Sequence, residues 1–258
     1  MDKVTNNFEL NISIEPALLN RLKDSNMKLC LMRSFRDPLS TKPDPTIWIA
    51  SADYIENNTF IWERESGYKI YISKSDSIIG DVSNKYPINF GETFKITDSE
   101  GHGKMAPNLK AAGDGLFITN TTMRDFFVGL EQELDFNGSK QPSAPISNQK
   151  IQKKSNIIIC PATKVYVTFT SSNTVPGARF EPSYASGILI EMTNFDNELV
   201  TRQIQYKTGS DGISHQWETF PTPGEYWSTV IPKDRSLTFY LVPEDELMKL
   251  VQKTTTKR

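Results

Sequence analysis

The sequence predicts a mainly β protein. Three observations lead to this class: stretches in which apolar and polar residues alternate, turn-forming residues between those stretches, and an aromatic share of 10%. Short strands at intervals of about 8–12 residues are typical of a sandwich or barrel. We therefore expect two β-sandwich or barrel-like modules with one short N-terminal helix and one short C-terminal helix.

The first half of the chain begins with strict alternation. In residues 8–14 every second side chain is Phe, Leu or Ile, which is the pattern of a half-buried strand. Pro16 then introduces a short apolar-sided segment, 17–23, and proline at a first helical position favours a helix. Further strands are expected at 28–34, 46–50, 59–63, 68–73, 92–97 and 116–119, separated by turn residues.

Residues 121–136 fit two secondary structures. Their apolar residues are spaced as on one face of a helix, whereas Gly129 and the strand-like neighbour 116–119 favour an extended chain. We expect a strand and keep the helix as the alternative.

A composition change marks the expected domain boundary. Residues 138–155 contain Pro142, Pro145, several Ser and Asn residues and four lysines without an acid, as in an exposed linker. This predicts an N-terminal β domain at 1–137 and a C-terminal β domain at 156–258, each of ordinary domain size. One continuous fold with a long surface insertion is the alternative.

The second half repeats the β pattern. Strands are expected at 164–169, 188–193, 200–206 and 237–241, with hairpin connections at 194–197 and 209–212. Pro243 and the acidic residues 244–246 are suited to the first turn of a C-terminal helix.

Charge and cysteine content restrict the class of partner. The formal net charge is -2, so the basic excess that most nucleic-acid binders use against phosphate is absent, and we expect no nucleic-acid partner. Cys30 and Cys160 each lie in an apolar run, which favours two buried free thiols. A single disulfide between them is the alternative.

The N-terminal residues do not resemble an ordinary signal peptide, and no apolar run approaches the roughly 20 residues of a membrane-spanning helix. We expect a soluble cytoplasmic protein, with release by a non-standard route left open.

No catalytic motif stands out. The two histidines, His102 and His215, fit an exposed loop and a strand, and the Gly-Lys pair at 103–104 lacks the remainder of a phosphate-binding loop. Neither a serine-hydrolase elbow nor a calcium loop is found. We expect a protein that is not an enzyme and that holds no cofactor and no metal.

Clustered aromatic residues are the main indication of a ligand. Aromatic rings beside acids and amides can stack on sugars or lie at a membrane interface, although β proteins also use them as core. The residues expected to bind a ligand are Trp227, Tyr226, Trp217, Glu225, Trp62 and Trp48.

These observations predict a non-catalytic binding protein that recognises glycans or another surface through loops and exposed aromatics. One alternative is a pore-forming or membrane-active protein of toxin type, because the Thr/Ser-rich alternation at 163–174 resembles a membrane-inserting hairpin. The other is a self-assembling structural β protein. A glycan or cell-surface component, membrane contact and a homo-oligomer are all compatible with the sequence.

Overall fold

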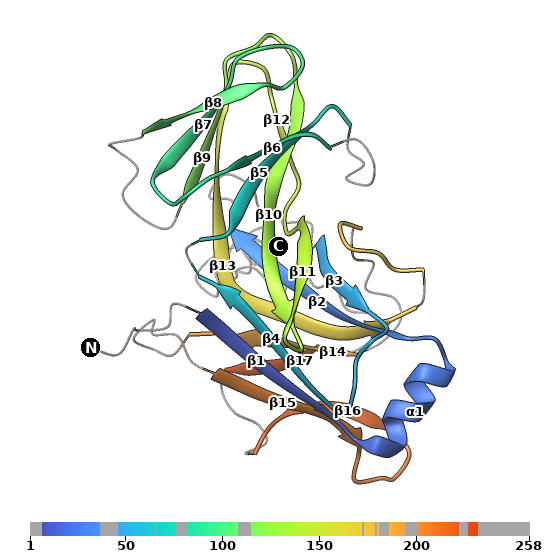
Figure 1. Cartoon of the computed structure of the whole chain (residues 1–258). Helices are drawn as coiled ribbons and strands as arrows, with labels where there is room; N and C mark the ends of the chain where they lie inside the picture. The colour runs from blue at the N-terminus through green and yellow to red at the C-terminus, as the bar shows by residue number, and fades with distance from the viewer. Residues whose placement is uncertain are drawn as a thin grey trace, which may run out of the picture.

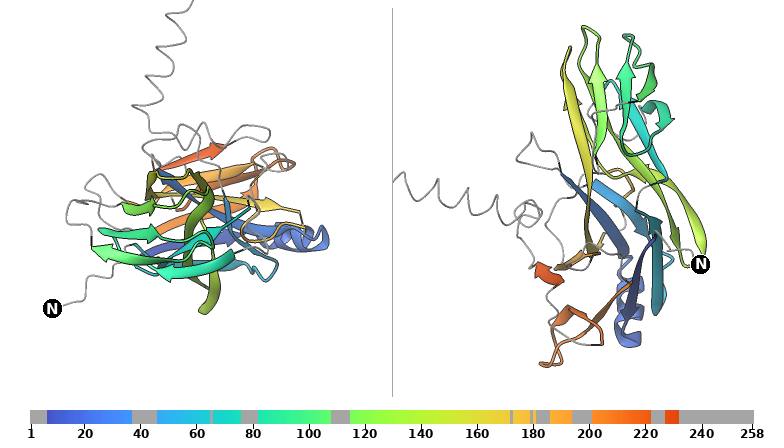
Figure 2. Two further views of the ribbon diagram at one scale, coloured as in Figure 1. Left: turned by 90° about the horizontal axis from the view of Figure 1, so that it is seen from above. Right: turned by 90° about the vertical axis from the view of Figure 1, so that its left-hand side faces the viewer.

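A computed structural model of the chain describes residues 7–36, 46–64, 66–75, 82–107, 115–171, 173–178, 180, 186–193, 201–221 and 227–231. Within these residues one short helix accompanies two extended sheets, which confirms the mainly β class (Figure 1). Figure 2 shows an elongated molecule, with α1 (Pro16–Asp24) at one end and the green strands β7 and β8 at the other.

The first sheet has nine strands. Seven follow the order β16 (His215–Thr219), β15 (Thr201–Thr208), β1 (Asn7–Ile14), β4 (Asn57–Glu63), β10 (Phe126–Phe136), β5 (Tyr68–Ser73) and β6 (Val82–Pro87). The other two, β11 (Ser139–Pro145) and β12 (Gln149–Ile151), pair with β10. β1 joins distant parts of the chain, since it is antiparallel to β4 and parallel to β15.

The second sheet has eight strands. Six follow the order β17 (Ser228–Ile231), β14 (Gly187–Glu191), β13 (Asn156–Thr170), β9 (Leu116–Asn120), β7 (Glu92–Ile96) and β8 (Gly103–Pro107). β2 (Lys28–Arg36) pairs with β13 and with β3 (Thr46–Ser51).

Two long strands connect the ends of the molecule. β13 pairs with β9 through residues 156–159 and with β2 through residues 160–170. β10 pairs with β5 and then with β4 along one edge, and with β12 and β11 along the other. In Figure 1 both strands run from the upper part of the molecule into the lower part.

The segment expected as a linker contains ordered strands. Residues 138–155 include β11 and β12, and both strands are hydrogen-bonded neighbours of β10. In the described residues each sheet also combines strands from both sides of this segment, as the β1–β15 pair shows. The division into domains 1–137 and 156–258 stays a prediction.

Other expectations have clear outcomes. Of the residues 121–136 that were expected as a strand, 126–136 form β10 and 121–125 form a turn. α1 covers the segment predicted as the N-terminal helix. The strand expected at 237–241, the hairpin connection at 194–197 and the helix beginning at Pro243 lie outside the described residues.

One hydrophobic core fills the space between the sheets. Successive side chains of a strand point to opposite faces, so the alternating apolar residues of β1 and β4 all lie on one face of the first sheet. That face packs against apolar side chains of β2, β13 and β14. Members of the core include Leu10, Phe60 and Leu130 from the first sheet and Leu31, Val167 and Ile190 from the second. The four tryptophans also contact this core.

The two cysteines are not joined in a disulfide. Cys30 is buried on β2 with its Sγ 3.1 Å from Thr170 Oγ1, and Cys160 on β13 is half-buried. Desolvation raises the pKa of Cys30 to about 11, so its thiol stays protonated at neutral pH. In the part of the chain that the structure describes, no helix is long and apolar enough to cross a membrane.

Two carboxylates, Asp211 and Glu15, accept hydrogen bonds from backbone N–H groups. Asp211 Oδ1 accepts the backbone N–H groups of Ile213 and Ser214 at 2.9 and 2.8 Å, and these hydrogen bonds hold its pKa below 3.8. Glu15 Oε2 accepts the Thr208 N–H at 2.6 Å, which similarly lowers the pKa of Glu15 from 4.5.

Acidification is expected to destabilise the protein through these two carboxylates. A carboxyl group with a lowered pKa stabilises the fold above its unfolded-state pKa, and this contribution disappears as the pH falls through the folded-state pKa. The free energy of unfolding should therefore begin to fall below about pH 5, as carboxyl groups begin to take up protons in the unfolded chain. Urea titrations across this range test the expectation, and Asp211→Asn should show a shallower decline. A decline of equal slope in the variant would contradict it.

Candidate functional site

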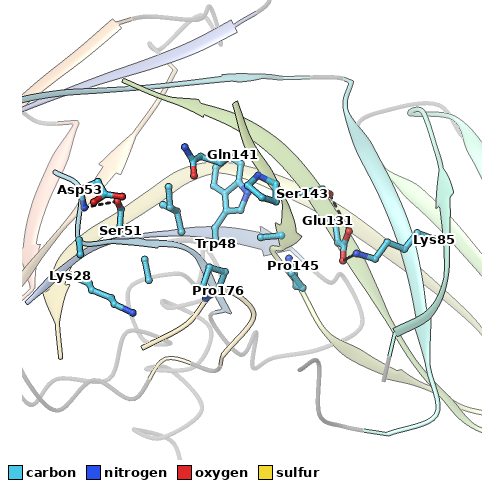
Figure 3. A pocket seen from close by; sticks show the side chains of 15 residues that line it. Lys28, Trp48, Ser51, Asp53, Lys85, Glu131, Gln141, Ser143, Pro145 and Pro176 are labelled. Carbon is cyan, nitrogen blue, oxygen red and sulfur yellow. Dashed lines mark hydrogen bonds and ion pairs between the residues drawn. The ribbon is translucent and has the colours of Figure 1, made fainter. Parts of the chain in front are cut away.

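A cavity opens where β3 approaches β11, the strand beside β10 in the other sheet. Its volume is about 690 Å³, within the range of cavities that hold small molecules. β3 and the residues after it supply one wall, and β11 supplies another (Figure 3). The polar residues in its lining are Lys28, Ser51, Asp53, Lys85, Glu131, Gln141 and Ser143.

A buried carboxylate lies at one end of the cavity. The Glu131 side chain on β10 is only 2% exposed, and its Oε1 lies 2.8 Å from Lys85 Nζ on β6. Ser143 Oγ on β11 donates to Glu131 Oε2 at 3.1 Å. A buried carboxylate needs such partners, because desolvation of an unpaired charge is costly. Three strands thus hold this group in one position.

A close approach between β5 and β10 lies two residues from Glu131. Tyr71 lies over Gly129, where a Cβ atom would come within 2.5 Å of the Tyr71 hydroxyl. That hydroxyl donates to the carbonyl oxygen of Ser147. Burial, and secondarily the negative charge of Glu131, raise the pKa of Tyr71, so it remains a neutral donor.

Trp48 gives the cavity a fixed aromatic wall. Its side chain is 1% exposed, and its Nε1–H donates to the Gln132 carbonyl oxygen at 3.0 Å. The ring meets Trp62 edge-on at 5.4 Å between centroids. The guanidinium of Arg33 lies 5.9 Å from the Trp48 ring and donates to the Gln132 side chain.

The remaining lining offers both donors and acceptors. Lys28 Nζ donates to the Thr174 carbonyl oxygen at 2.8 Å, and Gln141 Nε2 donates to the Ser139 carbonyl oxygen at 3.1 Å. Asp53 lies at the end of the cavity away from Glu131 (Figure 3). Ala50, Pro142, Pro145 and Pro176 add apolar surface between these polar groups.

Most of the residues predicted to bind a ligand do not form an exposed aromatic surface. Trp48, Trp62 and Trp217 are buried, because each points into the core between the sheets. Trp227 is half-buried under the Arg202 guanidinium, 4.6 Å from its ring. Tyr226 and Glu225 lie outside the described residues.

Two of these tryptophans nevertheless border hollows. Trp48 lines the large cavity, and Trp62 lines a smaller one of about 220 Å³ beside Glu63, Glu133 and Asp135. Trp217 packs on Phe169 and Tyr206, and Trp227 packs against the core beside Arg202. The predicted site as a whole includes Tyr226 and Glu225 and therefore stays a prediction.

Comparisons with protein-family models, with curated proteins and with solved structures found no match. The cavity is therefore the basis for a functional proposal.

The sequence pattern did not single out Glu131, Ser143 or Lys85. With 31 acids in the chain, no single carboxylate is conspicuous. Glu131, Gln132 and Glu133 are three adjacent polar residues between Leu130 and Leu134, and the sequence does not indicate which of them point inward. In the structure Glu131 and Gln132 are buried with hydrogen-bond partners, whereas Glu133 is exposed.

Proposed function

We propose that the protein is a non-catalytic binding protein that holds a small polyhydroxylated ligand, such as a sugar unit of a glycan, between β3 and β11. The observation that carries this proposal is the Glu131 carboxylate, buried and held by Lys85 and Ser143 at the end of a 690 Å³ cavity. A carboxylate has about four acceptor positions, so it can accept ligand hydroxyl groups beyond these two partners.

The rest of the lining suits the same ligand class. Sugar rings combine hydroxyl edges with apolar C–H faces, and the cavity combines an amide and hydroxyl groups with proline and alanine surface. The two acids of the lining, Glu131 and Asp53, lie at opposite ends (Figure 3). This favours binding over glycoside hydrolysis, for which two carboxyl groups flank one bond.

Glu131→Gln is expected to weaken saccharide binding about tenfold or more, because charge-assisted hydrogen bonds are roughly twice as strong as neutral ones. A panel of neutral saccharides screened by ligand-observed NMR or on a glycan array measures this. Glu133→Gln is the matched control, since Glu133 lies two residues away on β10 and pairs at the surface with Lys69. The control should bind like the parent protein.

Three outcomes would contradict the proposal. If no saccharide of the panel binds, the ligand class is wrong. If saccharides bind equally well to Glu131→Gln, the cavity is not their site. Binding lost in Trp227→Ala but kept in Glu131→Gln would place the ligand beside Trp227 instead.

A further inference from the structure

Three turns meet at the end of the molecule opposite α1. They are residues 97–102 between β7 and β8, residues 121–125 between β9 and β10, and residues 152–155 between β12 and β13. Figure 1 shows them together at the top of the molecule, and we call them the tip.

Hydrogen bonds join the three turns. The N–H of Lys154 donates to the Thr122 carbonyl oxygen at 3.2 Å, and Arg124 Nη1 donates to the Ser99 carbonyl oxygen at 3.4 Å. The Asn120 amide donates to the carbonyl oxygens of Arg124 and Gln152 at 2.7 and 3.0 Å. The tip is thus one structure that presents its exposed side chains together.

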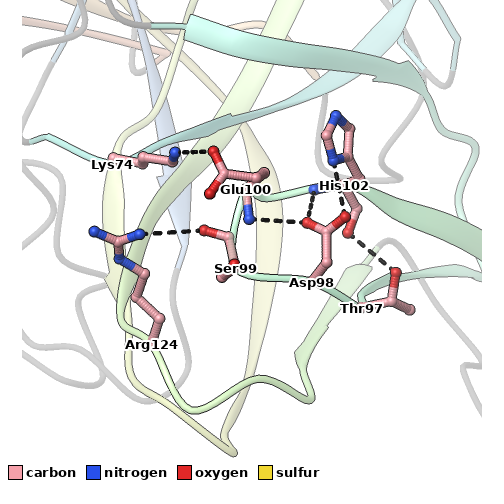
Figure 4. Close-up of polar contacts among 7 residues, drawn as sticks. All are labelled: Lys74, Thr97, Asp98, Ser99, Glu100, His102 and Arg124. Carbon is pink, nitrogen blue, oxygen red and sulfur yellow. Dashed lines mark hydrogen bonds and ion pairs between the residues drawn. The ribbon is translucent and has the colours of Figure 1, made fainter.

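The first turn is also ordered internally. Asp98 Oδ1 accepts the N–H groups of Glu100 and His102 at 2.9 Å each, and its Oδ2 lies 2.8 Å from His102 Nδ1 (Figure 4). Desolvation alone would raise the pKa of Asp98, but these hydrogen bonds outweigh it and the pKa is lowered. Asp98 therefore stays ionised, and both of its carboxylate oxygens bind groups within its own turn.

An apolar side chain projects from the tip. Met123 is 73% exposed at the middle of the 121–125 turn, with exposed Arg124 and Asp125 beside it. The rest of this turn is held by hydrogen bonds, from the Asn120 amide to the Arg124 carbonyl oxygen and from the Thr122 hydroxyl to Asn120 Oδ1. Met123 therefore has no role in the core and is free to contact another surface.

The tip and the residues next to it carry excess positive charge. The cations of the tip itself are Arg124, Lys153 and Lys154, which equal its carboxylates, Asp98, Glu100 and Asp125, in number. The excess comes from Lys74 and Lys150, which lie just outside the three turns and pair with two of these carboxylates. Lys74 pairs with Glu100, and Lys150 pairs with Asp125 at 2.9 Å. Among the described residues no carboxylate forms an ion pair with Arg124, Lys153 or Lys154. The chain as a whole has a net charge of -2, so positive charge is concentrated here.

We propose that the tip docks on an anionic lipid bilayer. Met123 enters the boundary between headgroups and acyl chains, while Arg124, Lys153 and Lys154 lie against lipid phosphate and carboxylate groups. Exposed apolar side chains with adjacent cations bind such interfaces through buried apolar area and electrostatic attraction together. A sulfated polysaccharide would match the charge, but it offers no apolar phase for Met123.

Co-sedimentation with vesicles tests the docking. The full chain should bind vesicles of equimolar phosphatidylcholine and phosphatidylserine, should not bind phosphatidylcholine alone, and should dissociate at about 1 M salt, where the Debye length is only about 3 Å. Lys153→Ala with Lys154→Ala should weaken binding roughly 30-fold, because each cation near an anionic surface contributes about fivefold. Met123→Ser should weaken it about tenfold.

Ile213→Ser is the matched control. Ile213 is 83% exposed in the turn between β15 and β16, at the other end of the molecule (Figure 1). This variant should bind vesicles like the parent chain. The proposal is overturned if the parent chain does not bind anionic vesicles, or if Ile213→Ser weakens binding as much as Met123→Ser. It is also overturned if Met123→Ser binds normally while heparin competes, which would identify a polyanion as the partner.

Discussion

Gly129→Ala is expected to destabilise the fold by about 3 kcal/mol or more, which places it among the severe overpacking substitutions. A Cβ atom at this position would lie 2.0 Å from the Ser147 carbonyl oxygen and 2.5 Å from the Tyr71 hydroxyl. Neither neighbour can retreat easily, because the Tyr71 hydroxyl donates to that same carbonyl group and both residues are buried. Urea denaturation should show the loss as a lower midpoint.

Gly138→Ala is the control for this substitution. Gly138 lies in the turn between β10 and β11 with φ +77°, and a Cβ atom added there would meet no other atom within 4 Å. Alanine there should lower the free energy of unfolding by only roughly 1–2 kcal/mol, the cost of a left-handed backbone conformation for a residue with a Cβ atom. Equal stability of Gly129→Ala and the parent protein would show that Tyr71 does not lie over β10 as described.

Trp217→Ala is expected to cost about 3–5 kcal/mol, the usual range for removing a buried large aromatic side chain. Trp217 is 2% exposed and stacks on Phe169 with 5.4 Å between centroids. Its Nε1–H donates to the Ser186 carbonyl oxygen at 3.1 Å. The substitution therefore removes apolar contacts and leaves a carbonyl group without its donor.

Trp227→Ala is the control for Trp217→Ala, because Trp227 is only half-buried. Trp227 is half-buried and its main described partner is the Arg202 guanidinium, so its loss should cost only about 1 kcal/mol. Thermal or urea unfolding of both variants measures the difference. Similar losses of stability in the two variants would mean that Trp217 is not the core residue described.

Local patterns predicted many of the strands. The alternation in residues 8–14 is sufficient for β1, because one face of that strand meets the core and the other carries polar groups. Gly129 indicated the extended state of 126–136, and the structure supplies the reason in Tyr71, which occupies the space of a side chain. Strand partners were not predictable, because the parallel pairing of β1 with β15 leaves no local pattern.

Composition was a poorer guide than alternation at residues 138–155. Proline, serine and lysine are common in linkers, but they are also tolerated in edge strands that need few backbone donors. β11 is such a strand, with Pro142 exposed, Pro145 half-buried and Ala144 buried.

The candidate site was largely invisible in the sequence. The presence of a tryptophan in the sequence does not show whether its ring is exposed or buried. In the structure Trp48, Trp62 and Trp217 are core residues. Glu131, Lys85 and Ser143 come from three strands and acquire their relation only through sheet pairing. Residues that are far apart in the sequence and follow no common spacing cannot be predicted to form such a cluster.

The pairing of β1 has a consequence for synthesis on the ribosome. β1 can join β4 early, but its other edge must wait for β15, whose residues 201–208 emerge nearly 200 residues later. An apolar strand with an open edge is prone to associate with other chains during this delay. The nascent protein should therefore depend on chaperones until β15 has been made.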